Sequence, residues 1–537
     1  MKSFPAILLL SVFIMHVPIK AQQVKEIIAY YPEWGAENLR YTVKDLEKSG
    51  AADKLTTIMY AFCYPAPDSM GNIVPMFMNA YAAYQQPYSA GMSIDSVADD
   101  SAKGQVLMGQ FNQLKKLKAR YPRLRVMISI GGWTGSVYFS DAALTKEARE
   151  KFVDAVIDRY ILGDLPVVEN GAGGKGAAKG VFDGIDIDWE YPIAGGNEGI
   201  HNNPADNDNC TEMLALFRKK LDEVRPGLLL TAAVPTASRL VHNFNVNKDQ
   251  EYLDWYNVMT YDLRSSWSSV TGHHTNLFST LSALLPDGMK ESMDYAVRLF
   301  RDSLGVANKK IVPGAAFYGR GWITKDTINC GLYRQGTVAP GVHESGYNYY
   351  SDLSKLLQND YCYRWDDLAM APTIFDHKSK AFWTFDDPKS VALKSRYVDA
   401  YDLRGIMFWE ISGDDSTGSL LNAIYRADMM VDASTVNLKA KYEGTDKVRE
   451  IKITSPVSSA NLTQGTSLVI TTDGISNADK LIKVEFFVDN KYLGSDTNVP
   501  FSWAWFNISK GQHELSVVGT DARGRKVNSD KVIVKVE

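Results

Sequence analysis

Four carboxylic acids stand close together in one short apolar stretch, residues 181–192, which reads VFDGIDIDWEYP. They are Asp183, Asp186, Asp188 and Glu190. Acidic side chains are rarely buried in full, yet the Val, Ile and Phe residues around them are typical of a buried strand. A buried carboxyl group that keeps its proton can serve as a general acid. The stretch therefore predicts acid–base chemistry.

Alternation along this strand places three of the acids on one face. Residues two apart share a face, so Asp186, Asp188 and Glu190 form a ladder with steps of about 6.6 to 7 Å. The apolar residues between them point the other way, toward covering helices: Ile185, Ile187 and Trp189. Three ionised carboxylates inside a barrel would repel one another and lose hydration, so at least one should stay protonated. Asp183 lies on the opposite face and is expected to be structural.

The sequence before and after this stretch contains further apolar runs, which predict the other strands of the sheet around it. Short runs rich in Val, Ile, Ala and Tyr recur without clean alternation, as in parallel strands covered on both faces. Eight of them are predicted strands: 26–31, 56–62, 124–130, 181–190, 228–234, 256–262, 310–319 and 404–411. Helical patterns lie between several of them. This order predicts an α/β fold, a (β/α)8 TIM barrel over residues 22–428, larger than the ~250 residues typical of that fold.

Two insertions interrupt the barrel pattern. Residues 64–104 follow the second strand, and residues 322–400 are long enough to form an inserted α+β lobe. A Gly/Ala-rich loop at 170–180 precedes the acid strand, but no GKS or GKT follows it, which argues against a phosphate-binding loop.

The pattern changes toward the C-terminus. Residues 429–447 are expected to be a linker, and residues 448–537 alternate polar and apolar residues between turn signals. Short strands at this spacing predict a small all-β immunoglobulin-like sandwich. Trp503 and Trp505 share a face there; packing is the favoured interpretation and sugar binding the alternative.

The N-terminus predicts export. Residues 1–21 combine Lys2, an apolar run and a small residue at the expected cut, as in a secretory signal peptide. We expect a secreted monomer, extracellular or periplasmic. The net charge of -5 and pI near 6.0 argue against nucleic-acid and membrane partners.

Four cysteines leave the question of disulfides open. They are Cys63, Cys210, Cys330 and Cys362. Export permits disulfides, and a pair within the insertion, 330 with 362, is the favoured one, although free thiols are as acceptable. There is no CxxC and no His pair at ligand spacing, so no metal and no cofactor are expected.

Several motifs resemble glycoside hydrolase family 18, the chitinases and their relatives, over about residues 24–425. FDGIDIDWEYP matches the family's DxxDxDxE signature, SIGGW (129–133) is similar to its third-strand motif, and MTYD (259–262) to its sixth-strand motif. GIMFWEISGDD (405–415) resembles the eighth strand, and residues 381–405 resemble the end of the lobe in one chitinase subgroup. The long segment 64–104 and the Gly-rich loop depart from the family pattern.

The resemblance implies a retaining, substrate-assisted cleavage of β-1,4 linkages between N-acetylglucosamine units of chitin or chitooligosaccharides. Glu190 would be the general acid and base, and Asp188 would orient the 2-acetamido group of the substrate. Asp188 would share a proton with Asp186. The remaining roles follow from the same motifs: Tyr30 and Ser129 supporting Asp186, Tyr261 donating to the acetamido oxygen, Trp409 under the sugar, Met259 and Asp262 lining that subsite, and Trp133 on the leaving-group side.

Three alternatives remain at this stage. An endo-β-N-acetylglucosaminidase acting on N-glycans uses the same acid strand, but such enzymes usually lack the large lobe. A non-catalytic chitin-binding lectin generally loses the acid that Glu190 provides here. A mainly structural surface protein would rely on the C-terminal sandwich for adhesion.

Overall fold

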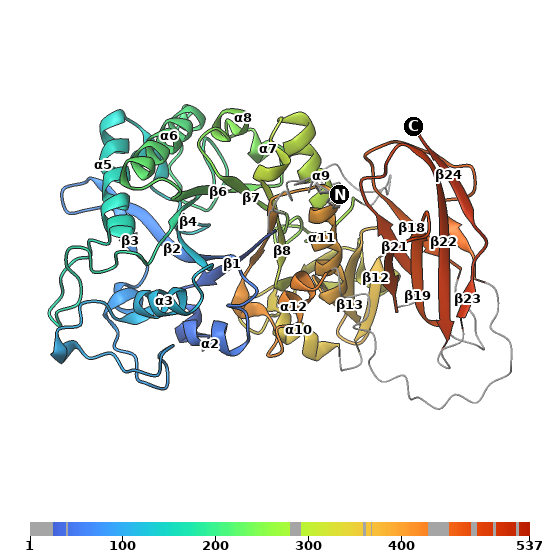
Figure 1. Ribbon diagram of the computed structural model, residues 1–537, viewed down its shortest axis with the longest axis horizontal. Coiled ribbons are helices and arrows are strands. Elements are labelled where there is room, and N and C mark those ends of the chain that lie inside the picture. The colour runs from blue at the N-terminus through green and yellow to red at the C-terminus, as the bar shows by residue number, and fades with distance from the viewer. Residues whose placement is uncertain are drawn as a thin grey trace, which may run out of the picture.

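The computed structural model describes residues 25–38, 41–279, 291–357, 361–366, 368–427, 451–473, 481–497, 501–521 and 526–537. The expected signal peptide and linker lie outside the described residues. A barrel with its lobe and a separate β-rich domain lie side by side (Figure 1).

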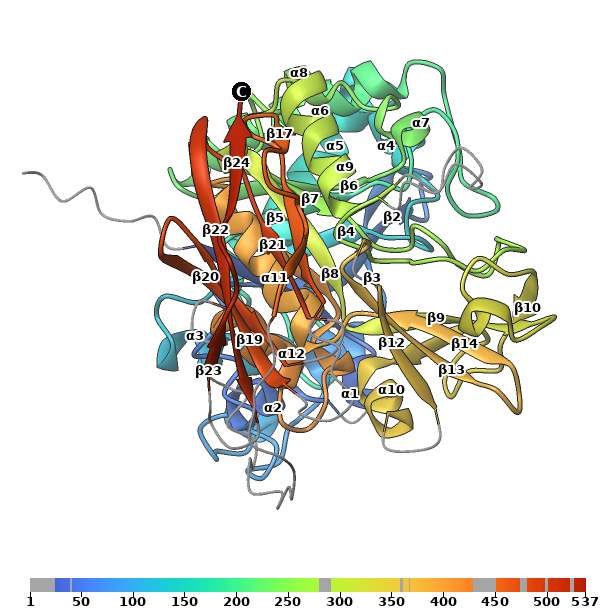
Figure 2. The same cartoon turned by 90° about the vertical axis from the view of Figure 1, so that its right-hand side faces the viewer.

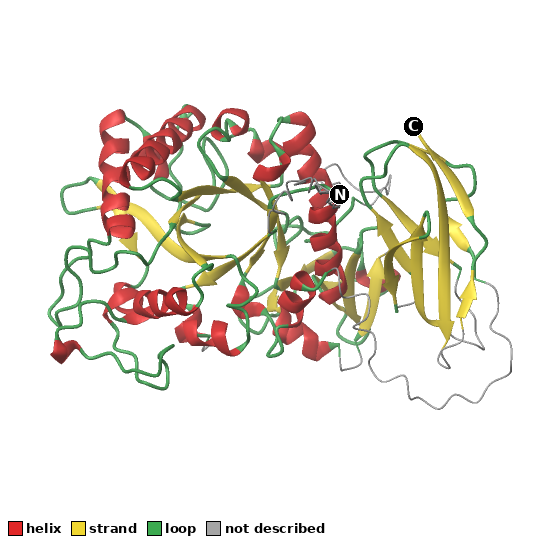
Figure 3. Ribbon diagram, in the orientation of Figure 1, coloured by secondary structure: helices red, strands yellow, loops and turns green. Residues whose placement is uncertain are grey.

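Eight parallel strands close into the barrel, which confirms the predicted fold class. Their order around the ring is β1-β15-β8-β7-β6-β5-β4-β2, and β2 pairs with β1 to complete it. Figure 3 shows the ring of strands with helices outside it. The strands are β1 (Glu26–Pro32), β2 (Thr57–Pro67), β4 (Arg125–Gly131), β5 (Gly184–Asp188), β6 (Leu229–Pro235), β7 (Trp255–Met259), β8 (Ile311–Ala316) and β15 (Gly405–Trp409).

Amphipathic helices cover the outside of the ring. The longer ones are α3 (Gly109–Arg120), α5 (Lys146–Val156), α6 (Asp206–Val224) and α11 (Pro388–Ala400). Shorter ones are α1 (Gly35–Asn38), α2 (Val43–Lys48), α4 (Phe139–Ala143), α7 (Ser238–Val241), α8 (Val246–Asp249), α9 (Met293–Arg298) and α12 (Ser419–Tyr425). Helix α10 (Tyr350–Leu356) packs on the inserted lobe instead. No helix in the described part of the chain is both long and apolar enough to cross a membrane.

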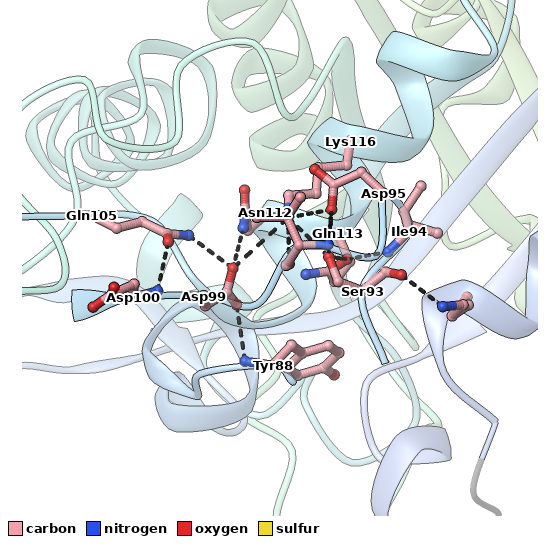
Figure 4. A network of polar contacts seen from close by, with 12 residues as sticks. Tyr88, Ser93, Ile94, Asp95, Asp99, Asp100, Gln105, Asn112, Gln113 and Lys116 are labelled. Atoms are coloured by element: carbon pink, nitrogen blue, oxygen red, sulfur yellow. Dashed lines mark hydrogen bonds and ion pairs between the residues drawn. The ribbon is translucent and has the colours of Figure 1, made fainter. Parts of the chain in front are cut away.

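The segment after β2 is ordered by a hairpin and by polar contacts with α3. β2 pairs with β3 (Ile73–Phe77), and a loop then returns to α3. The buried Asp99 carboxylate accepts bonds from Tyr88 N (3.0 Å), Gln105 Nε2 (2.8 Å) and Asn112 Nδ2 (2.7 Å) (Figure 4). Lys116 binds the Asp95 carboxylate at 2.8 Å. Side chains of α3 thus hold this loop by polar contacts, while Tyr84, Ile94 and Leu107 of the loop are buried in the apolar core.

The insertion forms an antiparallel sheet of order β10-β9-β14-β13-β12, with β11 paired to β9. Its strands are β9 (Tyr318–Thr324), β10 (Gly336–Val338), β11 (Tyr347–Tyr349), β12 (Cys362–Asp366), β13 (Ala371–Asp376) and β14 (Ala381–Phe385). The sheet therefore begins at Tyr318, whereas the sequence placed the lobe at 322–400. Helix α11, within that span, contacts β8 and β15 of the barrel. It starts where Asp387 caps the N–H of Ser390 and Pro388 occupies the first turn.

The C-terminal domain consists of two β-sheets. One contains β16 (Ile453–Ser455), β18 (Leu468–Thr472) and β21 (Ser502–Trp505). The other contains β17 (Asn461–Leu462), β19 (Leu481–Val488), β20 (Lys491–Asp496), β22 (Gly511–Asp521), β23 (Lys526–Asn528) and β24 (Val532–Val536). Trp503 and Trp505 are both buried, at 8% and 7% exposure, so they serve packing.

This domain docks on helix α11 of the barrel, and in Figure 2 it faces the viewer, in front of that helix. The Phe506 ring meets the ring of Tyr397 at 5.4 Å and that of Phe278 at 6.1 Å. Lys389 binds the carboxylate of Asp496 at 2.7 Å. Aromatic packing and a largely buried ion pair therefore join the two domains.

Candidate active site

The acid ladder points into the barrel, as predicted. Its apolar neighbours on β5 pack outward, and Trp189 stacks on Phe139 of α4 at 5.2 Å. The interior is a small separate apolar cluster lined by Tyr30, Met59, Met127, Trp255, Val312 and Met407, among others. The carboxylates therefore sit in a water-poor environment, where charge is costly.

Asp186 is fully buried and accepts four hydrogen bonds. Two come from residues predicted for this role, Tyr30 Oη at 2.8 Å and Ser129 Oγ at 2.9 Å. Two come from the next strands, Thr231 Oγ1 at 2.6 Å and Asn257 Nδ2 at 3.1 Å. Burial raises the pKa of Asp186, and these donors oppose the rise, Thr231 most of all. The surroundings of Asp186 can therefore accommodate either its protonated or its ionised form.

Asp188 and Glu190 hold protons more tightly than ordinary carboxyl groups. Burial raises the pKa of Asp188 well above its usual value, and the charges of Glu190 and Asp186 add to the effect. Burial also raises the pKa of Glu190 to about 7, with Asp262 contributing. One oxygen of Asp188 has no hydrogen-bond partner in the described part of the chain. These two residues can therefore supply a proton to a ligand, and the unpaired oxygen of Asp188 can accept a hydrogen bond from it.

Close backbone contacts position the end of β5. Gly131 has φ +113°, and a Cβ there would lie 2.2 Å from the carbonyl oxygen of Asp188. Gly132 donates its N–H to the same oxygen at 2.8 Å. Ser136 Oγ accepts the N–H of Glu190 at 2.9 Å. The two glycines of SIGGW therefore allow β4 to approach β5, and the turn after them fixes the backbone of the acid.

Aromatic rings line the interior beside the ladder. Trp409 meets Tyr30 at 5.6 Å and stacks on Phe62 at 5.6 Å, and Trp34 extends the group at 6.1 Å from Trp409. Phe62 and Trp34 were not predicted as site residues, although Phe62 is the last residue of one predicted strand and Trp34 follows the end of another. Such a surface suits the apolar face of a sugar ring.

Tyr261 and Met259 contact the same interior cluster, as their motif predicts. The Tyr261 hydroxyl contacts only the Met407 sulfur, at 3.7 Å, in the described part of the chain. That weak acceptor leaves the hydroxyl able to donate to a ligand. A Cβ at Gly314 of β8 would lie 2.6 Å from the Tyr261 ring, so glycine there makes room for it.

Asp262 is paired with a residue of the lobe. Arg320 of β9 donates to both carboxylate oxygens, at 2.7 and 2.8 Å. Burial works against ionisation, but Arg320 holds the pKa of Asp262 below its usual value. Asp262 therefore carries a negative charge near Glu190, and the lobe takes part in the electrostatics of the site. Nothing in the sequence pattern predicts this role for Arg320.

Two exposed tryptophans stand on loops that follow barrel strands. Trp133, predicted from its motif, exposes 50% of its surface after β4, and Trp267, which was not predicted, exposes 67% after β7.

A further buried acid, Glu410, follows Trp409. Burial raises its pKa to about 7, and one of its oxygens has no partner among the described residues. Glu410 is therefore another buried carboxyl group whose pKa lies above its usual value.

Comparison with known families decides the identity of this barrel. The family model described as Glycosyl hydrolases family 18 matches residues 26–414. The chain belongs to this family. A second model, Bacterial Ig domain, matches residues 450–517, in agreement with the predicted C-terminal sandwich.

Several chitinases are similar to this chain. Chitinase A1 of Niallia circulans is 31% identical over 416 residues, which are 72% of this chain and 56% of that protein. The catalytic domain of psychrophilic chitinase B from Arthrobacter TAD20 aligns with a TM-score of 0.69 and 33% identity, over 75% of this chain and 95% of that one. Chitinase ChiA74 from Bacillus thuringiensis, at 24% identity, shares the fold over 96% of this chain and 85% of that one, with a TM-score of 0.64. The chain spans less than two thirds of the length of the first curated relatives it matches.

Proposed function

We propose that this protein is a chitinase that hydrolyses β-1,4 linkages between N-acetylglucosamine units. The observation that carries the proposal is the pair at the end of β5: Glu190, whose pKa is raised to about 7, and Asp188, which has a free carboxyl oxygen. No second carboxylate is required as a nucleophile, because the acetamido group of the substrate can take that part. The chitinases among the relatives support this choice of substrate.

In the first step, Glu190 protonates the glycosidic oxygen. Asp188 turns its free oxygen to the acetamido N–H, which aligns the acetamido oxygen for attack on the anomeric carbon. That attack breaks the glycosidic bond and forms a cyclic oxazolinium ion. Tyr261 donates its hydroxyl proton in a hydrogen bond to the acetamido oxygen, and the unprotonated oxygen of Asp188 accepts the acetamido N–H, a hydrogen bond that strengthens as positive charge develops on the acetamido group.

The proton balance of this step involves Asp186. When Asp188 turns toward the substrate, it keeps the proton that it shared with Asp186 and approaches Glu190. Asp186 then remains as a carboxylate, held by its four donors. Their geometry suits that ionised state, because charge-assisted hydrogen bonds are stronger than neutral ones.

In the second step, Glu190 acts as a base. It removes a proton from water, which attacks the anomeric carbon and reopens the ring with net retention of configuration. Trp409 forms the floor under the reacting sugar, with Met259 beside it. Trp133 stacks on the leaving-group side.

The substitution Glu190→Gln tests the assignment. It keeps the shape of the side chain and removes the transferable proton, so turnover of chitooligosaccharides should be almost lost while binding is retained. NMR of the first products from the parent enzyme should show the β-anomer, and a thiazoline analogue of the oxazolinium ion should inhibit. Inverted products, or equal turnover by both proteins, would contradict the mechanism.

Export and the alternative activities are tested separately. The N-terminal sequence pattern supports secretion through cleavage after residue 21, which N-terminal sequencing of the mature protein would reveal. Release of a high-mannose glycan, without hydrolysis of chitooligosaccharides, would instead identify an endo-β-N-acetylglucosaminidase.

A further inference from the structure

Three side chains able to bind a metal converge on the insertion lobe, outside the acid ladder. Cys330 lies in the turn Ile328–Gly331, Cys362 begins β12, and His377 follows β13. The two sulfurs and a ring nitrogen of His377 all lie within 4.8 Å of one another. Cys362 and His377 are exposed and Cys330 is half-buried, so an ion from solution can reach them.

The sheet register brings two of these side chains together. Cys362 stands opposite Phe375 in the antiparallel pair β12–β13. His377 is two residues beyond Phe375, and its ring meets the Phe375 ring edge-on at 5.0 Å and 88°. The phenylalanine therefore orients the imidazole beside the first residue of the edge strand.

The third side chain is presented by a strained turn. Asn329 and Cys330 have φ values of 53° and 46°, in the left-handed region that non-glycine residues adopt at a cost. Arg364 of β12 donates to the backbone oxygen of Asn329 and to its side-chain oxygen, which ties this turn to the edge strand. Strain of this kind persists where surrounding contacts enforce it, and it is common in ligand clamps.

We infer that Cys330, Cys362 and His377 bind one Zn²⁺ ion. Thiolate and imidazole are the ligands that zinc prefers, at about 2.3 Å for sulfur and about 2.0–2.1 Å for nitrogen. The side chains therefore need to close only slightly from their present spacing. Binding releases the two thiol protons, so the assembled centre is neutral, and water takes the fourth position.

The sequence favours a disulfide between the two cysteines. Such a bond would not involve the His377 imidazole that lies beside them. The ion would instead join the turn, the edge strand and the segment after β13. It would do so beside a small apolar cluster formed by Trp322, Leu332, Phe375 and Phe382. Small cores of this kind gain from a cross-link.

Metal titration of the full-length protein tests this inference. The protein is reduced, stripped of metal with a chelator and titrated anaerobically with Co²⁺, then with Zn²⁺. We expect one Co²⁺ per chain, with a thiolate-to-cobalt charge-transfer band and the visible bands of four-coordinate cobalt. Zn²⁺ should abolish these bands and raise the melting temperature.

Single substitutions identify the ligands. Cys362→Ser should abolish the charge-transfer band, and His377→Ala should weaken binding by at least about tenfold, since even changes around a ligand cost about 10–100-fold. Both positions are exposed, so the variants should fold. His343→Ala, at another exposed histidine of the lobe, serves as the matched control and should bind like the parent.

Two results would overturn the inference. One is cobalt binding that survives both ligand substitutions, which would mark an adventitious surface ion. The other is a Cys330–Cys362 disulfide, detected by mass spectrometry of the protein as isolated, that forms again when equimolar Zn²⁺ is present.

Discussion

The substitution Thr231→Val isolates one hydrogen bond to the ladder. Thr231 Oγ1 donates to Asp186 at 2.6 Å in a fully buried setting, and it is the donor that most lowers the pKa of this aspartate. Valine keeps the shape and removes the hydroxyl. A hydrogen bond to a charged group contributes about 1.5–3 kcal/mol.

That free energy should appear in the rate, because the mechanism leaves Asp186 charged after Asp188 turns to the substrate. A loss of about 1.5–3 kcal/mol corresponds to a fall in kcat/KM of roughly 10- to 150-fold. The pKa of Asp186 should also rise, which moves the acidic limb of the pH profile upward. A purely structural role for the hydroxyl would leave that limb in place.

A fluorogenic N-acetylglucosamine disaccharide, measured across pH, provides the assay. Thr57→Val is the matched control, since Thr57 is fully buried in β2 and its hydroxyl has no partner in the described part of the chain. It should keep parental kinetics. Thr231→Ser, which restores the hydroxyl, should recover most of the rate. Parental kinetics in Thr231→Val, or equal defects in the valine and serine variants, would refute the reasoning.

Three further predictions concern charge and packing. Activity requires protonated Glu190, whose pKa is about 7, so kcat/KM should fall as pH rises through that value. Asp262→Asn removes a negative charge that raises this pKa, so the alkaline limb of the pH profile should move to lower pH. An alkaline limb that stays in place would exclude this coupling between Asp262 and Glu190. Asp99→Ala leaves buried donors without an acceptor and should lower the free energy of unfolding by about 2–4 kcal/mol in denaturant titrations. Its control, Asp95→Ala, removes a 41%-exposed carboxylate and should cost below about 1 kcal/mol; equal losses would contradict the role of Asp99. Phe506→Ala should lower the melting temperature of the barrel as well as that of the sandwich, and independent melting would show that the interface is weak.

The ladder and much of its surroundings could be predicted because a parallel barrel brings the ends of its strands together. Tyr30, Ser129 and Tyr261 each sit in an apolar run at the end that faces the site. Thr231 and Asn257 were missed, although each is a single polar residue within a buried strand. The register pairs Asp186 with Thr231, so inward-facing polar residues on neighbouring strands were the available signal.

Residues contributed by the lobe could not be found in this way. Arg320 reaches Asp262 because β9 leaves the barrel directly after β8, and no periodicity in the sequence marks that turn. The same holds for Cys330, Cys362 and His377, which come from three segments of an antiparallel sheet. Ligand spacing in the sequence carries information only when the ligands share a segment, and here they do not.

Helix α11 links the docked domain to the barrel strand that carries Trp409. Its Lys394 is fully buried and binds the buried carboxylate of Asp386 and the hydroxyl of Thr275, each at 2.6 Å. Asp386 in turn accepts the N–H of Ala316, at the end of β8. Breaking such a pair leaves an uncompensated charge inside the protein, at a cost of about 3–5 kcal/mol. The helix therefore cannot shift freely, so the C-terminal domain, which packs on its outer face, rests on an element held rigidly to the active-site barrel.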